Sequence, residues 1–292
     1  MSRHLKGLLM TVFAVILLSP DSVLIRLVEE ASPEVDSWTV LFWRGLLYAV
    51  GVSLLVFLKY RLKTLEEFKK IGKGGLLIGL FSGISTGTFV FAIVYTSIAN
   101  ALVIISTGPI MIAIVSWFLL KEKSSLVTWA SMVIVFIGIY IVMSGSLGGE
   151  NLVGDFFALI TAVMMGFTFT LTRKYKDVNM VPVNAIGGVI AALIAYVMAS
   201  KISVPPEVIK YIIAMGVILS ISFSLITIAP RYMPAAEVGM IMPLETVLGS
   251  LIAWYVIHEE PSINALIGGS IVIVTLFCHS WYSTKLARNQ LS

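Results

Sequence analysis

Residues 79–100 read GLFSGISTGTFVFAIVYTSIAN, and residues 216–237 read GVILSISFSLITIAPRYMPAAE. The second stretch repeats the pattern of the first 137 positions later, with small residues matching small residues at every fourth place. The matches continue in order beyond the small residues: Tyr95 with Tyr232, Asn100 with Glu237, Trp117 with Trp254, and Glu122 with Glu259. Ordered matches of small, aromatic and polar residues over this length indicate an internal repeat.

On both sides of these two stretches, apolar runs cover almost the whole chain. Hydrophobic residues make up 58% of the sequence and charged residues 12%, which is about half the charge of a typical soluble domain. Crossing about 30 Å of hydrocarbon takes roughly 20 apolar residues, and a single span satisfies its own backbone polar groups only as a helix. The sequence predicts ten such helices, over residues 5–27, 37–58, 74–97, 99–120, 125–145, 152–172, 180–200, 207–229, 235–257 and 262–283.

The repeat divides these ten helices into two units of five, residues 1–146 and 147–292. Because five is an odd number, the second unit enters the membrane from the opposite side. The predicted fold is therefore an all-α integral membrane protein made of two inverted five-helix repeats, an architecture found in many secondary transporters. The apolar run after Met1 is as long as a full span and lacks an Ala-x-Ala cleavage site, so we interpret it as a retained first helix.

The basic residues lie mainly on one side of the predicted membrane. With the N-terminus in the cytoplasm, sixteen Lys and Arg residues fall in cytoplasmic segments and three in outer segments. The positive-inside rule then places both termini in the cytoplasm, as in a multi-pass protein of the bacterial inner membrane. The net charge of +4 thus reports topology and contact with lipid headgroups, and it does not indicate a nucleic-acid partner.

The chain has few residues for catalysis or metal binding. It contains one cysteine and three histidines, so we expect no internal disulfide and no metal site. Residues 83–87 match the nucleophile pattern G-x-S-x-G, but they fall inside a predicted helix and not on a strand-turn-helix elbow. The sequence has no phosphate loop for ATP. We expect no cofactor, and a membrane-embedded enzyme is the weakest alternative.

A stripe of glycines marks the third predicted helix. Gly75, Gly79, Gly83 and Gly87 recur at every fourth residue, and Gly216 begins the matching stripe on the eighth helix. Residues four apart lie on one helix face. Small residues on such a face let two membrane helices approach closely, so we predict that these glycines pack against other helices.

Two opposite charges are predicted at one depth on consecutive helices. Asp21 follows Pro20, which interrupts the first helix near its outer end. Arg44 lies about 10 Å from the outer end of the second helix, at a similar depth. The pattern favours an ion pair or a shared polar cavity with a role in substrate binding, coupling or gating. The alternative is that both side chains reach the outer headgroups, although Asp21 is short for that.

The ninth helix carries two carboxylates, Glu237 near its cytoplasmic end and Glu245 near the middle of the membrane. An unpaired carboxylate at mid-membrane is costly, so we expect Glu245 to be protonated, partnered or exposed to water. Pro243 loosens the backbone beside Glu245, and Pro109 does the same in the fourth helix. Interrupted helices in corresponding positions of two repeats point to the binding site. Asn100, the repeat partner of Glu237, completes the set of substrate or coupling candidates.

In their order along the chain, these motifs resemble the ten-helix EamA-type members of the drug/metabolite transporter superfamily. The most similar segments are Phe42-Trp43-Arg44-Gly45, Thr107-Gly108-Pro109, Pro243-Leu244-Glu245-Thr246-Val247 and His258-Glu259. The family usually has a glycine before the glutamate that ends the fourth and ninth helices, whereas this chain has Lys121 and His258 there. The resemblance covers essentially the whole chain and implies a basket-like cavity between the halves.

The resemblance also implies transport of small metabolites such as amino acids. We therefore expect a secondary transporter that exports amino acids or related compounds by alternating access around a central site. A lipid scramblase or a channel is the main alternative, because an inverted repeat alone does not distinguish it from a transporter. The expected partners are a small-molecule substrate and membrane lipids. The oligomeric state is open, and a homodimer is one of the alternatives.

Overall fold

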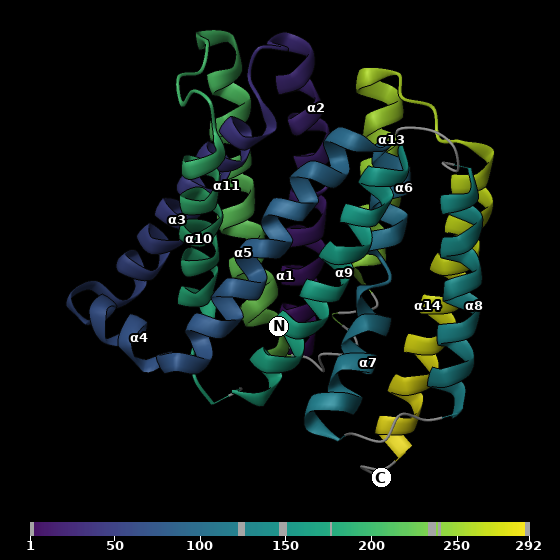
Figure 1. The fold of residues 1–292 in the computed structure, drawn as a ribbon. Helices are drawn as coiled ribbons and strands as arrows, with labels where there is room; N and C mark the ends of the chain where they lie inside the picture. The colour runs from purple at the N-terminus through teal and green to yellow at the C-terminus, as the bar shows by residue number, and fades with distance from the viewer. Residues whose placement is uncertain are drawn as a thin grey trace.

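The structure, a computed structural model, describes residues 3–121, 126–145, 151–175, 177–232, 238 and 241–289. In these ranges every regular element is a helix, and the long helices lie side by side across a common thickness (Figure 1). The elements are α1 (Arg3–Leu18), α2 (Asp21–Ala31), α3 (Ser37–Tyr60), η1 (Arg61–Lys63), α4 (Thr64–Lys70), α5 (Gly72–Tyr95), α6 (Ile98–Ile105), α7 (Gly108–Leu120), α8 (Leu126–Ser144), α9 (Asn151–Lys174), α10 (Val181–Met198), α11 (Pro206–Ile228), η2 (Ala229–Arg231), α13 (Pro243–Ile257) and α14 (Ile263–Asn289).

The helices follow the predicted spans in order. Within the described ranges, seven helical stretches are long and apolar enough to cross a membrane: His4–Ala31, Ser37–Lys70, Gly72–Tyr95, Ile98–Leu120, Asn151–Lys174, Val181–Met198 and Pro206–Ile228. Three shorter apolar helices, Trp129–Ser144, Pro243–Ile257 and Ile263–His279, fall within the other three predicted spans. The predicted all-α membrane fold is confirmed.

Contacts between helices follow a pattern that is preserved when the two halves are exchanged. α5 packs against α9, and α11, the counterpart of α5, packs against α1 and α2. In the same way α5 packs against α10, and α11 packs against α3. Two further pairs, α3 with α10 and α8 with α14, each join a helix to its own counterpart. The largest interfaces thus connect different halves, and the two repeats interleave into one bundle (Figure 1).

Glycines set the closest of these contacts between halves. Where α3 crosses α10, a Cβ on Gly45 would lie 2.8 Å from the carbonyl oxygen of Gly188, and one on Gly188 would lie 2.7 Å from that of Gly45. Gly138 and Gly268 face each other in the same way where α8 crosses α14, at 3.0 and 2.5 Å. Any side chain at these crossings would force the two backbones apart.

The predicted glycine stripe on α5 faces α10 through its central residues. A Cβ on Gly79 would lie 2.6 Å from Cγ2 of Ile186. One on Gly83 would lie 2.9 Å from Cγ2 of Ile190 and 3.0 Å from the carbonyl oxygen of Gly187. These two positions have no room for a side chain unless α10 moves.

The other predicted packing glycines have different surroundings. A Cβ on Gly87 would make an ordinary contact, 3.4 Å from Leu41 of α3. One on Gly75 would meet Ile71 of the preceding turn, and one on Gly216 would lie 2.4 Å from Cβ of Leu47. The stripe therefore changes partner along α5, from α10 at its centre to α3 at its end.

The fourth and ninth helices are interrupted at matching places in the repeat. α6 ends at Ile105 and α7 begins at Gly108, while α13 begins at Pro243, 137 positions after Ser106. Pro109 lies in the first turn of α7, where the missing N–H removes no helical hydrogen bond. Pro20 similarly stands immediately before α2. The prolines thus mark where new helical segments begin, and they do not bend continuous helices.

Both interrupted helices also end alike. Lys121 follows α7 and His258 follows α13, and both residues have φ 53° and ψ 28°, in the left-handed region. Their backbone N–H groups bond back to Ser116 and Ala253, respectively. Glycine adopts this conformation most easily, which explains why it is usual here in the family that the chain resembles. The chain keeps the same turn with other residues.

We expect Gly83→Ala to lower the free energy of unfolding in detergent by about 1–3 kcal/mol, because the added methyl group would press on Ile190 and on the backbone of Gly187. Gly87→Ala is the matched control, since its methyl group would meet Leu41 at an ordinary distance. Thermal unfolding of the purified proteins measures both effects. Equal stability of the two variants would show that α5 and α10 are not closely packed at Gly83.

Candidate functional site

Two oppositely charged side chains meet in the interior between α2 and α3. Nη2 of Arg44 donates to Oδ2 of Asp21 at 2.6 Å, and the two side chains are 4% and 2% exposed. The Arg44 guanidinium also lies over the ring of Phe89 on α5, 5.1 Å from its centroid. The structure thus brings together the two charges that the sequence places at one depth.

The break in the first membrane helix positions Asp21 for this contact. The chain leaves α1 at Leu18, passes Ser19 and Pro20, and begins α2 at Asp21. The carboxylate therefore lies at the N-terminus of a helix, where the helix dipole favours negative charge. A continuous helix would offer Asp21 neither this dipole nor any loosened backbone.

The ion pair leaves several buried polar atoms without hydrogen bonds to the described residues. They are Oδ1 of Asp21, Nε and Nη1 of Arg44, and Oγ of the neighbouring Ser22. Buried polar groups in proteins nearly always have a partner, and an unmade bond costs about 1–3 kcal/mol. These donors and acceptors are therefore available to a polar ligand.

Helix α13 brings a third ionisable side chain to the same place. Glu245 is partly buried in its first turn and lies close enough to Asp21 and Arg44 to interact with both charges. One turn further along α13, a Cβ on Gly249 would lie 3.7 Å from Oγ of Ser22. The site thus draws its charges from α2, α3 and α13, and it joins the two halves of the chain.

Contacts with α6 hold α13 in this position. Oγ1 of Thr246 donates to the carbonyl oxygen of Leu102 at 3.2 Å, and a Cβ on Gly249 would lie 2.5 Å from Cδ1 of Leu102. α6 and α13 belong to the two helices that are interrupted at matching places. The segments α6 and α13, each next to an interruption, thus pack against each other beside Ser22.

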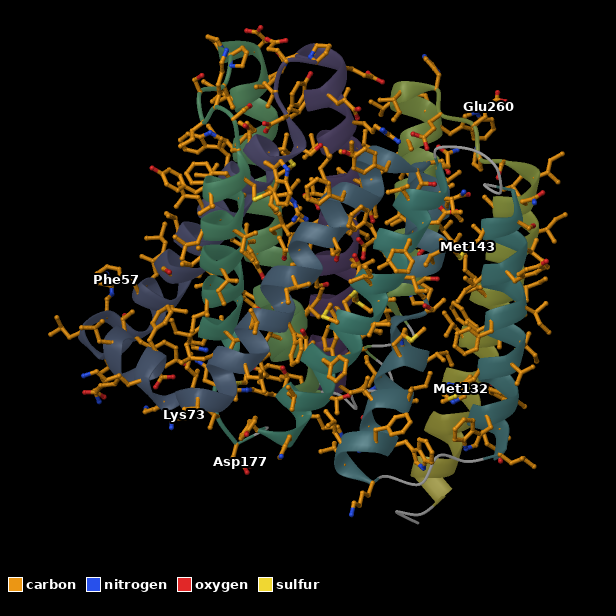
Figure 2. All side chains as sticks on the ribbon, viewed as in Figure 1. Phe57, Lys73, Met132, Met143, Asp177 and Glu260 are labelled. Atoms are coloured by element: carbon orange, nitrogen blue, oxygen red, sulfur yellow. The ribbon has the colours of Figure 1, made fainter. Side chains whose placement is uncertain are left out.

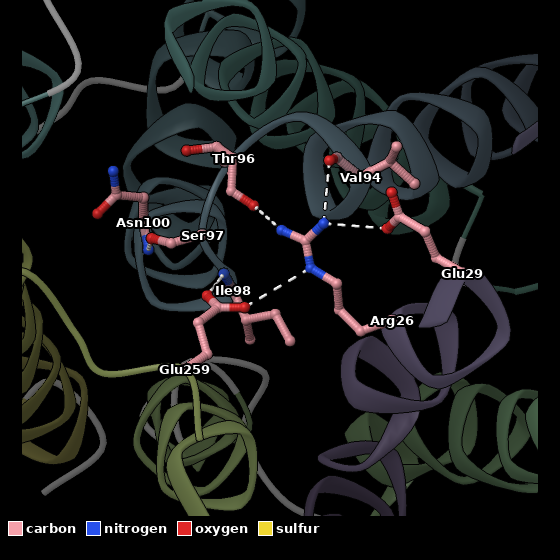
Figure 3. A network of polar contacts seen from close by, with 8 residues as sticks. All are labelled: Arg26, Glu29, Val94, Thr96, Ser97, Ile98, Asn100 and Glu259. Atoms are coloured by element: carbon pink, nitrogen blue, oxygen red, sulfur yellow. Dashed lines mark hydrogen bonds and ion pairs between the residues drawn. The ribbon is translucent and has the colours of Figure 1, made fainter. Parts of the chain in front are cut away.

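The two remaining predicted residues are not in this cluster of charges. Asn100 is buried in the first turn of α6, where its backbone N–H donates to Oγ of Ser97 at 3.1 Å. It lies beside the polar network drawn in Figure 3, toward the end of the bundle. Glu237 lies outside the described residues.

Asp155 on α9 is a buried charge that the sequence analysis did not single out. It is fully buried, and its Oδ1 accepts a hydrogen bond from Oγ1 of Thr96 at 2.7 Å. Its Oδ2 has no partner among the described residues. The signal was present, because an acidic residue inside the predicted span 152–172 breaks the apolar pattern as Asp21 does.

The arrangement places one guanidinium in contact with one carboxylate and within electrostatic range of a second, inside the membrane, where charges interact strongly and are rarely found without a function. It can hold a small molecule that carries both a positive and a negative group, and a carboxylate there can also carry a proton. No group of three or more His, Cys, Asp or Glu residues suited to a metal ion occurs within the described ranges.

Comparison with known proteins finds the same unit in each half of the chain. Residues 5–144 and residues 152–281 each match the model of the EamA-like transporter family. A solved crystal structure has a TM-score of 0.64 to this chain at 16% identity, and the match covers 95% of this chain and 97% of the other. That structure shares the fold.

Three curated relatives are described as uncharacterized transporters. The protein from Clostridium kluyveri is 24% identical, over 84% of this chain and 84% of its own length. YoaV from Bacillus subtilis is 20% identical, over 82% and 87%. The match to the protein from Methanothermobacter thermautotrophicus is 23% identical and spans 64% of this chain and 57% of that relative.

The buried ion pair leads to a test of stability. We expect Asp21→Asn or Arg44→Gln alone to lower the free energy of unfolding by about 3–5 kcal/mol, because each leaves the partner's charge buried and unpaired. The double variant should lose less than the sum of the two single losses. Unfolding of all four proteins in detergent gives the interaction free energy. Additive losses would show that the two charges do not stabilise each other.

Proposed function

Because the chain belongs to the EamA-like transporter family, we propose that it is a secondary transporter that exports amino acids or related small compounds by alternating access. The family and the relatives described as uncharacterized transporters support the broader statement that this chain is a membrane transporter. One observation carries the finer proposal: Asp21, Arg44 and Glu245 converge inside the membrane from both halves of the chain.

The charges at this site are complementary to a zwitterion. The unpaired Nε and Nη1 of Arg44 are donors for a substrate carboxylate, and guanidinium–carboxylate bonds are among the stronger hydrogen bonds in proteins. Oδ1 of Asp21 and the carboxylate of Glu245 are acceptors for a substrate ammonium group. A substrate with both groups would satisfy atoms that the protein leaves without partners.

The same charges offer a way to couple transport to protons. Arg44 attracts both carboxylates in the absence of substrate. A substrate ammonium group and a proton would compete for the carboxylate of Glu245, so each would occupy it in a different part of the transport cycle. Glu245 would then carry a proton with one half of the cycle. The chain has no phosphate loop for direct use of ATP, so we propose that an ion gradient drives transport, with the proton on Glu245 as the coupling ion.

Interleaving of the halves limits how access can alternate. The largest interfaces join α3 to α10, α5 to α9, and α8 to α14, so residues 1–146 and 147–292 do not form two separate bodies. We propose that groups containing helices from both halves tilt around the ion pair. The interrupted helices α6–α7 and α13 supply the backbone that such a movement needs.

The distribution of charge supports an orientation in the membrane. Lys73 lies on the face where α14 ends, whereas Glu260 lies on the opposite face, here named the distal face (Figures 1 and 2). The acidic segment around Glu34 connects α2 to α3 on the distal face. We propose that the distal face is extracytoplasmic and that both termini lie in the cytoplasm of a bacterial cell.

Transport is tested with purified protein in vesicles that carry a proton gradient and are offered a mixture of amino acids. We expect the zwitterionic amino acids to move against their gradient, and Glu245→Gln to abolish this coupled transport in a protein that still folds and inserts. Gln keeps the size and hydrogen bonding of Glu but cannot titrate. The matched control is Glu260→Gln, because Glu260 is exposed on the distal face.

Three results would count against this proposal. Full transport with unchanged pH dependence in Glu245→Gln would move proton coupling away from Glu245 and make Asp21 the better candidate. Flux of lipids without flux of amino acids would favour a scramblase. Flux down a gradient that never becomes coupled would favour a channel.

The orientation is tested separately with reporter fusions at Ser292 and in the loop at Glu34. We expect the two reporters to report opposite sides of the membrane, with the C-terminal fusion in the cytoplasm. Reporters on the same side would contradict the ten-helix topology.

A further inference from the structure

We propose that Arg26, Glu259 and Asp155 form a gate that closes the distal face above the Asp21–Arg44 pair. All three side chains hold the short segment Val94–Ile98, which joins α5 to α6 and is here named the α5–α6 linker. The proposal rests on the alternating access described above, and it names the residues that decide one half of that cycle.

Arg26 on α2 and Glu259, two residues beyond the end of α13, both bind the linker (Figure 3). Oε1 of Glu259 accepts a hydrogen bond from the backbone N–H of Ile98 at 2.5 Å, and Oε2 lies 3.6 Å from Nε of Arg26. Nη1 and Nη2 of Arg26 donate to the carbonyl oxygens of Val94 and Thr96, at 3.0 and 2.5 Å. The middle of α2 and the segment that follows α13 are thus bound to each other and to the linker.

Asp155 holds the linker from a third side. Its Oδ1 accepts the hydrogen bond from Oγ1 of Thr96, the same residue whose carbonyl oxygen binds Arg26. The neighbouring Gly154 lets α9 approach the linker closely, since a Cβ there would lie 2.4 Å from the backbone nitrogen of Thr96. The linker is therefore clamped by α2 of the first repeat and by α9 and the end of α13 of the second.

The clamp lies on the distal side of the candidate substrate site. Arg26 follows Asp21 by five residues on α2, which is about 7.5 Å toward the distal face at ~1.5 Å per residue. Ser22, whose unpaired hydroxyl belongs to the site, lies one turn below Arg26. Ser22 and Arg26, four residues apart, lie on one face of α2, so a path from the distal face along that face passes the clamp.

The two ion pairs differ in a way that suits one to opening and the other to holding substrate. Asp21 and Arg44 are in contact at 2.6 Å and are almost fully buried. Arg26 and Glu259 are 3.6 Å apart, and their side chains are 19% and 22% exposed. Partly hydrated pairs contribute little stability and separate at small cost, whereas separating a buried pair is expensive. The Arg26–Glu259 contact is therefore the part of the clamp that opens readily.

Accessibility of a cysteine beneath the clamp tests the proposal without any substrate. The chain's one cysteine, Cys278, is first replaced by Ser, and Ser22→Cys then places a thiol one turn below Arg26. A membrane-impermeant methanethiosulfonate reagent is applied to right-side-out and inside-out vesicles. We expect slow labelling from the distal face while the clamp is intact, and labelling at least about fivefold faster from that face in Arg26→Gln and in Glu259→Gln.

Further variants separate a gate from general loosening. Glu260→Gln, an exposed neighbour of Glu259, should leave the labelling rate unchanged. Gly83→Ala destabilises a different contact and should not raise it either. Glu259→Asp keeps the charge on a shorter side chain and should give an intermediate rate, which keeps the test usable where Glu259→Gln fails to fold. Asp155→Asn should also accelerate labelling, because it weakens the bond to Thr96.

Unchanged distal labelling in folded Arg26→Gln and Glu259→Gln proteins would overturn the gate, as would equal acceleration by Gly83→Ala. Failure of the proposed function looks different. If the vesicles move no amino acid but the two variants accelerate labelling, the proposed substrate is wrong and the gate is supported. If the vesicles transport amino acids but labelling is unchanged in both variants, the gate is wrong and the proposed transport function is supported.

Discussion

Close approach of helix backbones from different halves of the chain is the constraint on which the rest of this structure depends. Inside a membrane, lipid tails are as apolar as leucine, so helices do not associate to escape water. They associate where backbones fit together. Gly45 meets Gly188 and Gly138 meets Gly268 with no room for a side chain. These contacts interleave the repeats into one bundle, and both polar sites described above draw their residues from the two repeats.

Interruptions in the helices allow charged side chains to lie inside this packed bundle. A continuous membrane helix offers no free backbone dipole at mid-membrane, and an isolated charge there is costly. The break before Asp21 and the start of α13 at Pro243 create helix N-termini inside the bundle. Asp21 and Glu245 both lie in the first turn that follows such a start, where a negative charge is favoured. Each position follows from a break in a membrane helix, although the break before α2 in the first helix and the break before α13 in the ninth are not counterparts in the repeat.

The Asp21–Arg44 pair and the Arg26–Glu259 pair contain similar side chains but differ in burial, and we propose different roles for them. Both clusters join an arginine of the first repeat to carboxylates, and both include residues of the second. The Asp21–Arg44 pair is dry, short and incompletely satisfied, which suits a ligand-binding site. The Arg26–Glu259 pair is longer and partly hydrated, and its atoms are shared with the carbonyl and N–H groups of a connecting segment. Depth in the membrane accounts for this difference.

Much of the molecule could be predicted from local patterns. Apolar runs of sufficient length must be helices in lipid, and helix rise per residue is constant, so Asp21 and Arg44 could be assigned to one depth. The repeat revealed that the fourth and ninth helices are interrupted together. The left-handed turns at Lys121 and His258 were signalled only through the glycine that is usual there in the family.

The sequence by itself determined which segments cross the membrane, that they form two copies of one unit, and which charges lie within them. Only the tertiary structure decided which helices meet, because rotation of each helix about its axis is set by its neighbours and not by its own period. That is why Gly45 and Gly188, 143 positions apart, had no signal as a pair. It is also why Asp155 became significant only when Thr96 was seen beside it.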